Sequence, residues 1–278
     1  AEVTSIDLDK KLGKTVDRQA YPYRQLCWAA DQKTLYRLID PAKLATPGTS
    51  EIIQEKQTSL TDLTGNESVL TLYLSTSLSA DYFANISAAH FFYTPSPKGL
   101  SLAGEPPQHG NWETVREWLE RFFDLTTYEI SIPVLRNPDL APAGKSGLII
   151  SSLFSYKLTK YIYDHGWQDQ FKKFITQKMI QTLNDSIYPE IFTNVMDHFT
   201  STPVTLQKRT GNTDGAITGW AFTNPRMPAE SRLIRISNAV RTGLPAVTQA
   251  GQWTYSPSGF PVSLITGKLA ADRMEKSL

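Results

Sequence analysis

Hydrophobic and polar residues recur with two different periods along the chain, and the two periods predict both strands and helices. Short alternating or apolar runs predict strands at residues 3–8, 26–30, 69–75, 88–93 and 146–154. Apolar residues at helical spacing predict helices over residues 31–39, 50–56, 112–123, 157–165, 167–184 and 187–199, and from 261 onward. Asp31 and Asn111 stand where N-caps are expected. The chain is therefore predicted to mix strands and helices.

The C-terminal stretch has a layout that favours ligand binding. An apolar run, Leu244–Val247, predicts a buried strand, and a loop with Gly251 and Gly259 follows it. Pro261 suits the first position of the next helix, because its missing N–H has no partner there. A glycine-bearing loop before a helix N-terminus presents backbone N–H groups to an anion or an electron-rich ring. The alternative is an ordinary strand–helix unit whose glycines only permit close packing.

Composition and charge narrow the class of protein. The 278 residues are 40% hydrophobic and 11% aromatic, which indicates a globular protein with a sizeable core. The net charge of +1 predicts no general affinity for nucleic acid. Cys27 is the single cysteine, which excludes an internal disulfide and a thiolate cluster for zinc. The polar start and the lack of an 18-residue apolar run predict neither a signal peptide nor a membrane span, so we expect a cytoplasmic location.

Several nucleotide and hydrolase motifs are missing from the sequence. The chain contains no G-x-G-x-x-G, no P-loop, no H-E-x-x-H and no G-x-S-x-G. These absences argue against nucleotide hydrolysis, zinc proteolysis and ordinary serine esterase chemistry. They also mean that any dinucleotide held through a glycine-rich turn would use residues outside this sequence.

The C-terminal stretch resembles the FAD-contacting segment of the phytoene desaturase family, which includes carotenoid isomerases and retinol saturases and is related to the amine oxidases. The matching residues are Ala250-Gly251, Ser256–Pro261 and Thr266–Ala271. Weaker matches follow the family's order at Trp28–Asp31, Thr34–Ile39, Ile132-Pro133, Asn137–Gly144 and Gly215–Trp220. The chain departs from the pattern at Gln249, near an expected glycine, and lacks the acidic residue that holds the ribityl chain in some members.

The resemblance implies an α+β fold and a division into domains. Residues 1–39 and 215–278 would form an incomplete remnant of an FAD-binding α/β domain. Residues 40–214 would form a substrate-binding domain, with a mixed sheet flanked by helices. Because the match begins where the family's second half begins, we expect a C-terminal portion of a larger FAD-dependent oxidoreductase, inactive by itself.

The resemblance also implies the cofactor site. FAD would contact Ala250, Gly251, Gln252, Gly259, Phe260, Pro261 and Val262 in the full-length protein. This portion alone is expected to bind FAD weakly or not at all, because the pyrophosphate-binding turn is missing. We assign no catalytic residue and expect no metal. His90 lies in an apolar strand and is interpreted as a packed or partly exposed side chain rather than a catalytic group.

The family's substrates imply an extended apolar molecule, polyene- or lipid-like, and a desaturase, saturase or isomerase reaction. The strands predicted at residues 69–75 and 88–93 would then form the floor of the substrate cavity. The aromatic stripes of the helices between 157 and 199 either form core or line that cavity. Peripheral membrane contact near Lys172, Lys173 and Lys178 would give access to lipid. The alternative is a non-catalytic α+β domain that binds a lipid or a protein partner.

Overall fold

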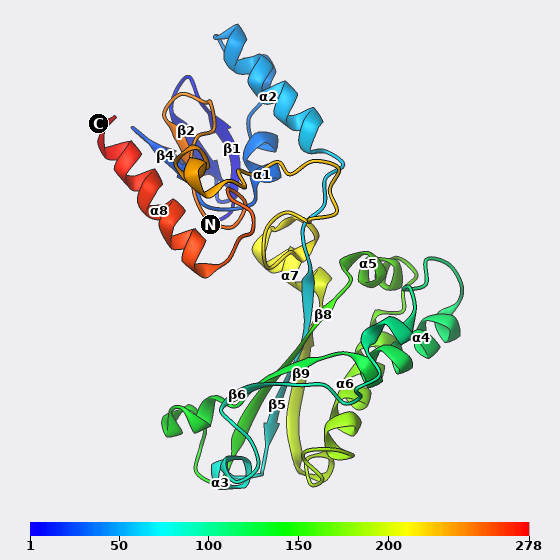
Figure 1. Cartoon of the computed structure of the whole chain (residues 1–278). Helices are drawn as coiled ribbons and strands as arrows, with labels where there is room; N and C mark the ends of the chain where they lie inside the picture. Colours follow the sequence, from blue (N-terminus) through cyan, green and yellow to red (C-terminus); the bar gives the residue numbers. More distant parts are fainter. Residues whose placement is uncertain (278) are drawn as a thin grey trace. The chain divides into compact units, whose positions relative to one another are not determined.

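The computed structural model describes residues 1–277 and divides the chain into two compact units, shown in Figure 1. Unit 1 comprises Ala1–Glu67 together with residues 207–277, and unit 2 comprises Ser68–Leu206. Unit 2 is thus inserted between the two parts of unit 1. Both units contain strands and helices, which confirms the α+β class.

Unit 1 contains two small sheets. An antiparallel sheet joins β1 (Val3–Asp7), β2 (Leu12–Thr15) and β3 (Ala20–Pro22). A parallel pair joins β4 (Leu26–Trp28) and β10 (Val247–Gln249), which come from opposite ends of the chain. The helices are α1 (Gln32–Arg37), α2 (Pro47–Leu60), the second half of α7 (Pro203–Thr210) and α8 (Phe260–Glu275). Short 3-10 helices η1 (Pro41–Lys43), η6 (Thr213–Gly215) and η7 (Leu233–Asn238) lie between them.

The boundary of unit 1 lies later in the chain than residue 39, where the sequence prediction placed it. Residues 40–67 belong to unit 1 because α2 packs against α1. Ile53 of α2 is fully buried in one cluster with Leu35, Tyr36 and Ile39. The assignment of unit 1 to flavin and of unit 2 to substrate stays a prediction.

Unit 2 is built on one five-stranded sheet. Its order is β6 (His90–Tyr93), β7 (Tyr128–Ser131), β8 (Ser146–Phe154), β5 (Ser68–Thr76) and β9 (Val195–Ser201). All four pairings are antiparallel, so the sheet is not mixed as expected. A mixed sheet needs at least one crossover connection between two parallel strands. In this sheet every pair of neighbouring strands runs in opposite directions, so no such crossover is present.

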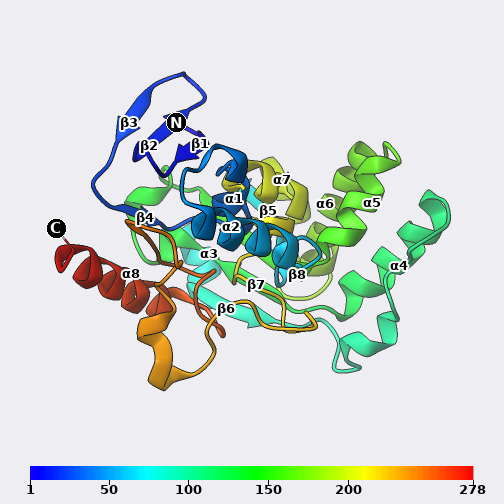
Figure 2. The ribbon, with the colours of Figure 1, turned by 90° about the horizontal axis from the view of Figure 1, so that it is seen from above.

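Helices cover one face of this sheet. Figures 1 and 2 both show α4 (Trp112–Leu125), α5 (Tyr156–Asp164) and α6 (Gln168–Asn184) on the same side of unit 2, while α3 (Ala80–Ala84) follows β5. The short 3-10 helices are η2 (Leu100–Ala103), η3 (Pro133–Leu135), η4 (Pro138–Leu140) and η5 (Phe192–Asn194). Alternate strand residues such as Leu70, Leu72 and Ile150 are buried against the helices. The residues between them point to the opposite face.

One predicted helix is wrong. Residues 187–199 carry apolar side chains at positions 187, 191, 195 and 199, which is helical spacing, but the second half of the segment forms β9. Val195 and Phe199 also fit a strand period, and pairing with β5 gives the strand hydrogen bonds and a stacking partner for Phe199. Tertiary pairing therefore decides between two patterns that the residues satisfy equally.

Candidate functional site

The residues predicted to contact FAD lie around the start of α8. Ala250 follows β10 and its backbone N–H donates to Trp28 O at 2.9 Å, which continues the parallel pairing with β4. Gly251 has φ of +87°, a conformation that side chains rarely adopt, so glycine suits this position. Its carbonyl accepts the backbone N–H and the hydroxyl of Thr254, which closes a tight turn directly after the strand.

Thr266 joins this turn to the helix. The Gly251 N–H donates to Thr266 Oγ1 at 3.0 Å, and the Thr266 hydroxyl donates to Val262 O at 2.9 Å. Thr266 is fully buried, so the linkage is shielded from water. The structure thereby joins the turn after β10 to the first turns of α8.

A close approach fixes the path of the loop at Gln252. A Cβ placed on Gly219, which has φ of +76°, would lie 2.2 Å from Gln252 O, so only glycine fits. Next to this contact, Trp220 donates from Nε1 to Trp253 O at 3.1 Å, and the two indole rings meet edge to face. The backbone around Gln252 is therefore held by packing on both sides.

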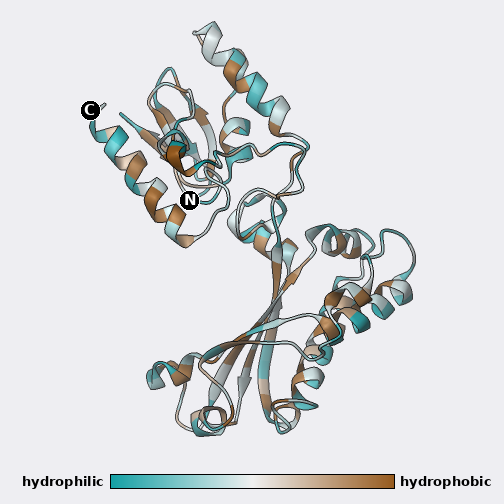
Figure 3. Ribbon diagram, in the orientation of Figure 1, coloured by the Kyte–Doolittle hydropathy of each residue, from teal (hydrophilic) through white to brown (hydrophobic). Residues whose placement is uncertain are grey.

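The N-terminus of α8 has no side-chain cap. Gly259 occupies the N-cap position, and its φ of 161° is ordinary extended backbone. Pro261 is the second helical residue rather than the first. The backbone N–H groups of Phe260 and Val262 lie in the first turn, where a helix provides no acceptor. The side chain of Phe260 is 77% exposed and Leu264 is exposed one turn later, and Figure 3 shows this apolar start of the helix in brown.

These features fit one end of FAD and not the other. Uncapped N–H groups, a positive helix end and exposed apolar side chains suit a flavin ring. Gly251 and Gly219 supply the close backbone packing that holds the loop beside the helix. The residues of this chain include no glycine-rich turn for the pyrophosphate. The fit is thus to the ring end of the cofactor alone.

The open face of the sheet in unit 2 is a second candidate site. Two rows of side chains cross all five strands on this face. The first row is Phe92, Glu129, Ser151, Thr71 and Ser201, and all but Phe92 are polar. The second row is His90, Ser131, Ile149, Tyr73 and Phe199, and its last three members form an apolar row across β8, β5 and β9. Tyr73 and Phe199 stack with ring centroids 4.3 Å apart, yet Phe199 is 63% exposed. Large exposed apolar side chains on a sheet face are typical of a binding surface.

Polar contacts order this open face. Thr71 and Ser151 share a hydroxyl hydrogen bond of 2.9 Å between β5 and β8. His90 Nε2 lies 2.8 Å from Glu129 Oε1 on the neighbouring strand. His90 is thus a partly exposed side chain with a carboxylate partner.

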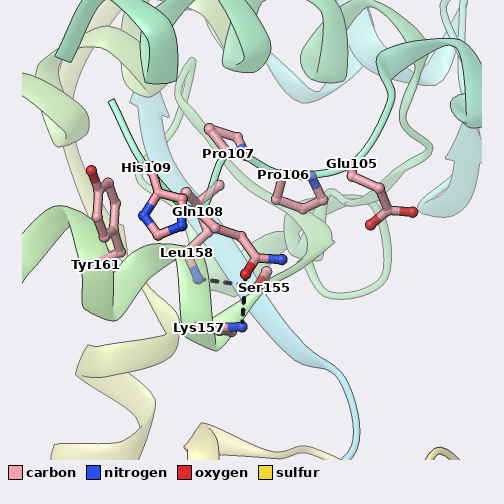
Figure 4. Close-up of a pocket in the computed structure, with 9 residues that line it drawn as sticks. All are labelled: Glu105, Pro106, Pro107, Gln108, His109, Ser155, Lys157, Leu158 and Tyr161. Atoms are coloured by element: carbon pink, nitrogen blue, oxygen red, sulfur yellow. Dashed lines mark hydrogen bonds between the residues drawn. The ribbon is translucent and has the colours of Figure 1, made fainter. Parts of the chain in front are cut away.

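A surface cavity of about 340 Å³ lies beside the loop 105–109 and the start of α5 (Figure 4). Its polar contacts are local: Lys157 Nζ lies 3.4 Å from Gln108 Oε1, and Ser155 caps the helix through Leu158 N–H. The side chains of Glu105, Gln108, His109 and Lys157 are all exposed. Water can satisfy these groups, so the cavity gives no sign of a built ligand site.

The described residues hold neither a cluster of metal-ligand side chains nor a helix that could span a membrane. Among residues 1–277, no three His, Cys, Asp or Glu side chains gather closely enough to hold a metal ion. In the same part of the chain, every helix is too short or too polar to cross a bilayer.

Comparison with known proteins gives only distant likenesses. No protein-family model matches the sequence, and no curated protein sequence does. A crystal structure of reduced UDP-galactopyranose mutase is similar, with a TM-score of 0.44 and 11% identity, over 72% of this chain and 33% of that one. An oxidoreductase from Methanosarcina mazei is similar with a TM-score of 0.48 and 10% identity, over 99% of this chain and 48% of that one.

Both likenesses are too distant to carry an argument about function. The chain spans less than half the length of either protein, 33% and 48% respectively.

Sequence patterns did not reveal some residues that shape these sites. Thr266 and Gly219 position the loop, and Phe199 forms part of the open sheet face. Thr266 and Gly219 lie within matched segments but carry no signal of their own. The place of Phe199 on the sheet was not predicted, because the helical spacing of residues 187–199 indicated a helix there.

Proposed function

We propose that this chain is the C-terminal part of an FAD-dependent oxidoreductase whose flavin ring lies at the start of α8. The observation that carries the proposal is the linkage from Gly251 through Thr266 to Val262, which holds the loop against an uncapped helix end. The family resemblance of the same residues supports it. When bound, FAD would supply the capacity to accept or donate a hydride or electrons.

The residues of this chain would bind and orient the flavin. The N–H groups of Phe260 and Val262 and the positive end of the α8 dipole would favour negative charge on the ring. The exposed Phe260 side chain would cover part of the ring and exclude water. Ala250, Gly251 and Gln252 would present backbone to the cofactor, and Pro261 would keep the first turn in place.

The substrate we propose is an extended apolar molecule, polyene- or lipid-like, which would be desaturated, saturated or isomerised. The open face of unit 2 supports this choice, because Ile149, Tyr73 and Phe199 form an apolar row across the adjacent strands β8, β5 and β9. Two inter-strand spacings of about 4.8 Å make this row about 10 Å long. Peripheral membrane contact near Lys172, Lys173 and Lys178 would provide access to such a substrate.

The test is the substitution Gly259→Val in the natural full-length gene product. A Cβ at Gly259 meets nothing nearer than Pro261 Cδ at 4.0 Å, so the protein should still fold. A branched side chain beside the uncapped N–H groups should keep the flavin away from the helix end. We expect flavin affinity to fall at least about tenfold, since the helix-end interaction is worth up to about 2 kcal/mol and 1.4 kcal/mol is one decade.

Gly48→Val is the matched control. Gly48 lies in the first turn of α2, where a Cβ meets nothing within 4 Å. It should leave flavin affinity unchanged, with similar small shifts in apoprotein melting temperature for both variants. A full-length protein purified without flavin, or equal flavin affinity in the wild type and Gly259→Val, would exclude a flavin at this loop.

A second candidate is a non-catalytic domain that binds a lipid or a protein partner on the open sheet face. The exposed Phe92, Leu153 and Phe199 favour it, because they require no cofactor to act as a binding surface. Flavin content of the full-length protein separates the two candidates. A colourless protein that still binds an apolar ligand would support the binding domain.

A further inference from the structure

We propose that a polar cavity in unit 1 binds a small organic anion that carries hydroxyl groups, of the sugar-phosphate class. The cavity, called the Gln32 cavity here, has a volume of about 490 Å³ and is lined by Gln32, Lys56, Arg232, Arg241 and Gln249, among others. This volume lies within the range of roughly 300–1,000 Å³ that is typical of small-molecule sites. The inference goes beyond the flavin proposal and does not depend on it.

A chain of two amides leaves one buried oxygen without a hydrogen-bond partner in the described residues. Gln249 Nε2 donates to Ala239 O at 2.8 Å, and Gln32 Nε2 donates to Gln249 Oε1 at 2.9 Å. Because a carbonyl oxygen can only accept, Ala239 fixes the orientation of Gln249, and Gln249 in turn fixes that of Gln32. Gln32 Oε1 therefore lies on the remaining side and has no hydrogen-bond partner in the described residues.

This oxygen is buried and held in place. Gln32 is 5% exposed and Gln249 is 7% exposed, so neither amide can turn freely towards solvent. A buried acceptor without a partner is destabilising unless a donor reaches it. Gln32 lines the cavity, but its Oε1 has almost no accessible surface, so a ligand hydroxyl would supply that donor after a small movement of the side chains around Gln32. The site thus recognises a hydrogen-bond donor as well as a charge.

The charges on the cavity wall favour an anion. Lys56, Arg232 and Arg241 are its basic lining residues, and Glu230 is its one acidic lining residue. The Glu230 carboxylate accepts the backbone N–H groups of Arg232 and Ser231, and the Arg232 contact holds its pKa below the usual range. Within residues 1–277, neither Lys56 nor Arg241 forms an ion pair. Both cations are therefore available to a phosphate or carboxylate group.

The class of ligand is tested by titration calorimetry of the natural protein with three probes. Glucose 6-phosphate carries both features that the cavity recognises, whereas glucose carries only hydroxyl groups and inorganic phosphate chiefly charge. We expect glucose 6-phosphate to bind at least tenfold more tightly than either of the others. Equal affinities for glucose 6-phosphate and inorganic phosphate, or no binding of glucose 6-phosphate, would overturn the proposal.

Two substitutions then assign the binding to this cavity. Arg241→Gln removes an exposed cation from the wall and should weaken glucose 6-phosphate binding at least tenfold. Arg235→Gln is the matched control, because Arg235 is exposed on nearby η7 and does not line the cavity. Equal effects of the two substitutions would show that the binding reflects general surface charge and would overturn the site.

Gln32→Met tests the buried oxygen. It removes the acceptor at similar volume, so glucose 6-phosphate binding should fall at least tenfold while inorganic phosphate binding changes less than twofold. Thermal melting of the variant shows whether the fold is retained. If Gln32→Met retains the fold and binds glucose 6-phosphate as the wild type does, the acceptor has no role; if it unfolds, the Arg241 and Arg235 pair still decides the site.

Discussion

Asp31 and Thr213 are joined by a hydrogen bond although they lie 182 residues apart in the sequence. Asp31 Oδ2 accepts the Thr213 backbone N–H at 2.8 Å, and its Oδ1 accepts the Thr34 N–H at 2.8 Å as the N-cap of α1. The carboxylate is 2% exposed. One buried side chain thus caps α1 and holds the returning part of the chain within unit 1.

The first prediction follows from this double role. Asp31→Ala removes a helix cap and a hydrogen bond to a carboxylate, and it leaves the partly buried Thr213 N–H without its acceptor. We expect a loss of about 2–4 kcal/mol in the free energy of unfolding. Urea denaturation measures it. Asn111→Ala is the control, because Asn111 caps α4 at an exposed position through Thr114, and it should cost about 1 kcal/mol. Equal losses for both variants would contradict the linking role of Asp31.

The second prediction concerns the contact between Gly219 and Gln252. Gly219→Ala would place a Cβ 2.2 Å from a backbone oxygen, so the loop must move as well as accept a left-handed residue. We expect a loss of about 3 kcal/mol or more in the free energy of unfolding. Gly211→Ala is the control that has the backbone strain without the steric clash. Gly211 has φ of +71°, but a Cβ placed there would meet no atom within 4 Å. This variant should lose about 1–2 kcal/mol in the free energy of unfolding. If Gly219→Ala lost no more free energy of unfolding than Gly211→Ala, the loop at Gln252 would be able to move away without cost.

Local patterns predicted most single elements because their signals lie within a few residues. The predicted strand 146–154 coincides with β8, and the Asp31 and Asn111 caps begin α1 and α4 as expected. The order of the strands could not be predicted, since it depends on which connection returns beside which neighbour. The helix expected over residues 187–199 failed for the same reason: the edge of β5 selects the strand.

The loop proposed to hold the flavin and the Gln32 cavity differ in how far the sequence could suggest them. The loop residues 250–262 are close together in the chain, so the sequence alone could offer them as a candidate site, and their contact with a flavin stays a prediction. Gln32 and Gln249 are 217 residues apart, and no motif links a single buried glutamine to another. Only the fold brings the two amides together, because β4 and β10 pair in parallel.

The third prediction concerns the open sheet face. Phe199→Ser removes the exposed ring that stacks on Tyr73 and should weaken the binding of cis-parinaric acid, a fluorescent conjugated polyene, by about tenfold or more. The reason is the loss of roughly 1.5–3 kcal/mol of apolar contact in the apolar row. Leu102→Ser, at a position 61% exposed on η2, is the control and should leave binding unchanged. A similar fluorescence titration for both variants would argue against this face as the ligand site.

The last prediction concerns Tyr36, a residue 1% exposed in the core of unit 1. Burial raises the pKa of its phenol to about 12 from an ordinary value near 10, because the charged phenolate loses hydration. A group whose pKa is raised by folding contributes stability below its unfolded pKa and loses it as the pH rises through its folded pKa. Tyr36 should therefore lower the free energy of unfolding between about pH 10 and pH 12. Tyr36→Phe removes this titration and should leave stability near the wild-type value at pH 8.

The test is the difference between wild type and Tyr36→Phe in urea denaturation at pH 8 and pH 11. Other tyrosines and lysines titrate in both proteins, so their effects cancel in the difference. Since one pKa unit corresponds to about 1.4 kcal/mol, the variant should gain about 1 kcal/mol on the wild type between the two pH values. Tyr21→Phe, at a position 51% exposed, is the control for removing a tyrosine hydroxyl and should follow the wild-type curve. A difference that is constant from pH 8 to pH 11 would mean that water reaches the Tyr36 hydroxyl in the folded protein.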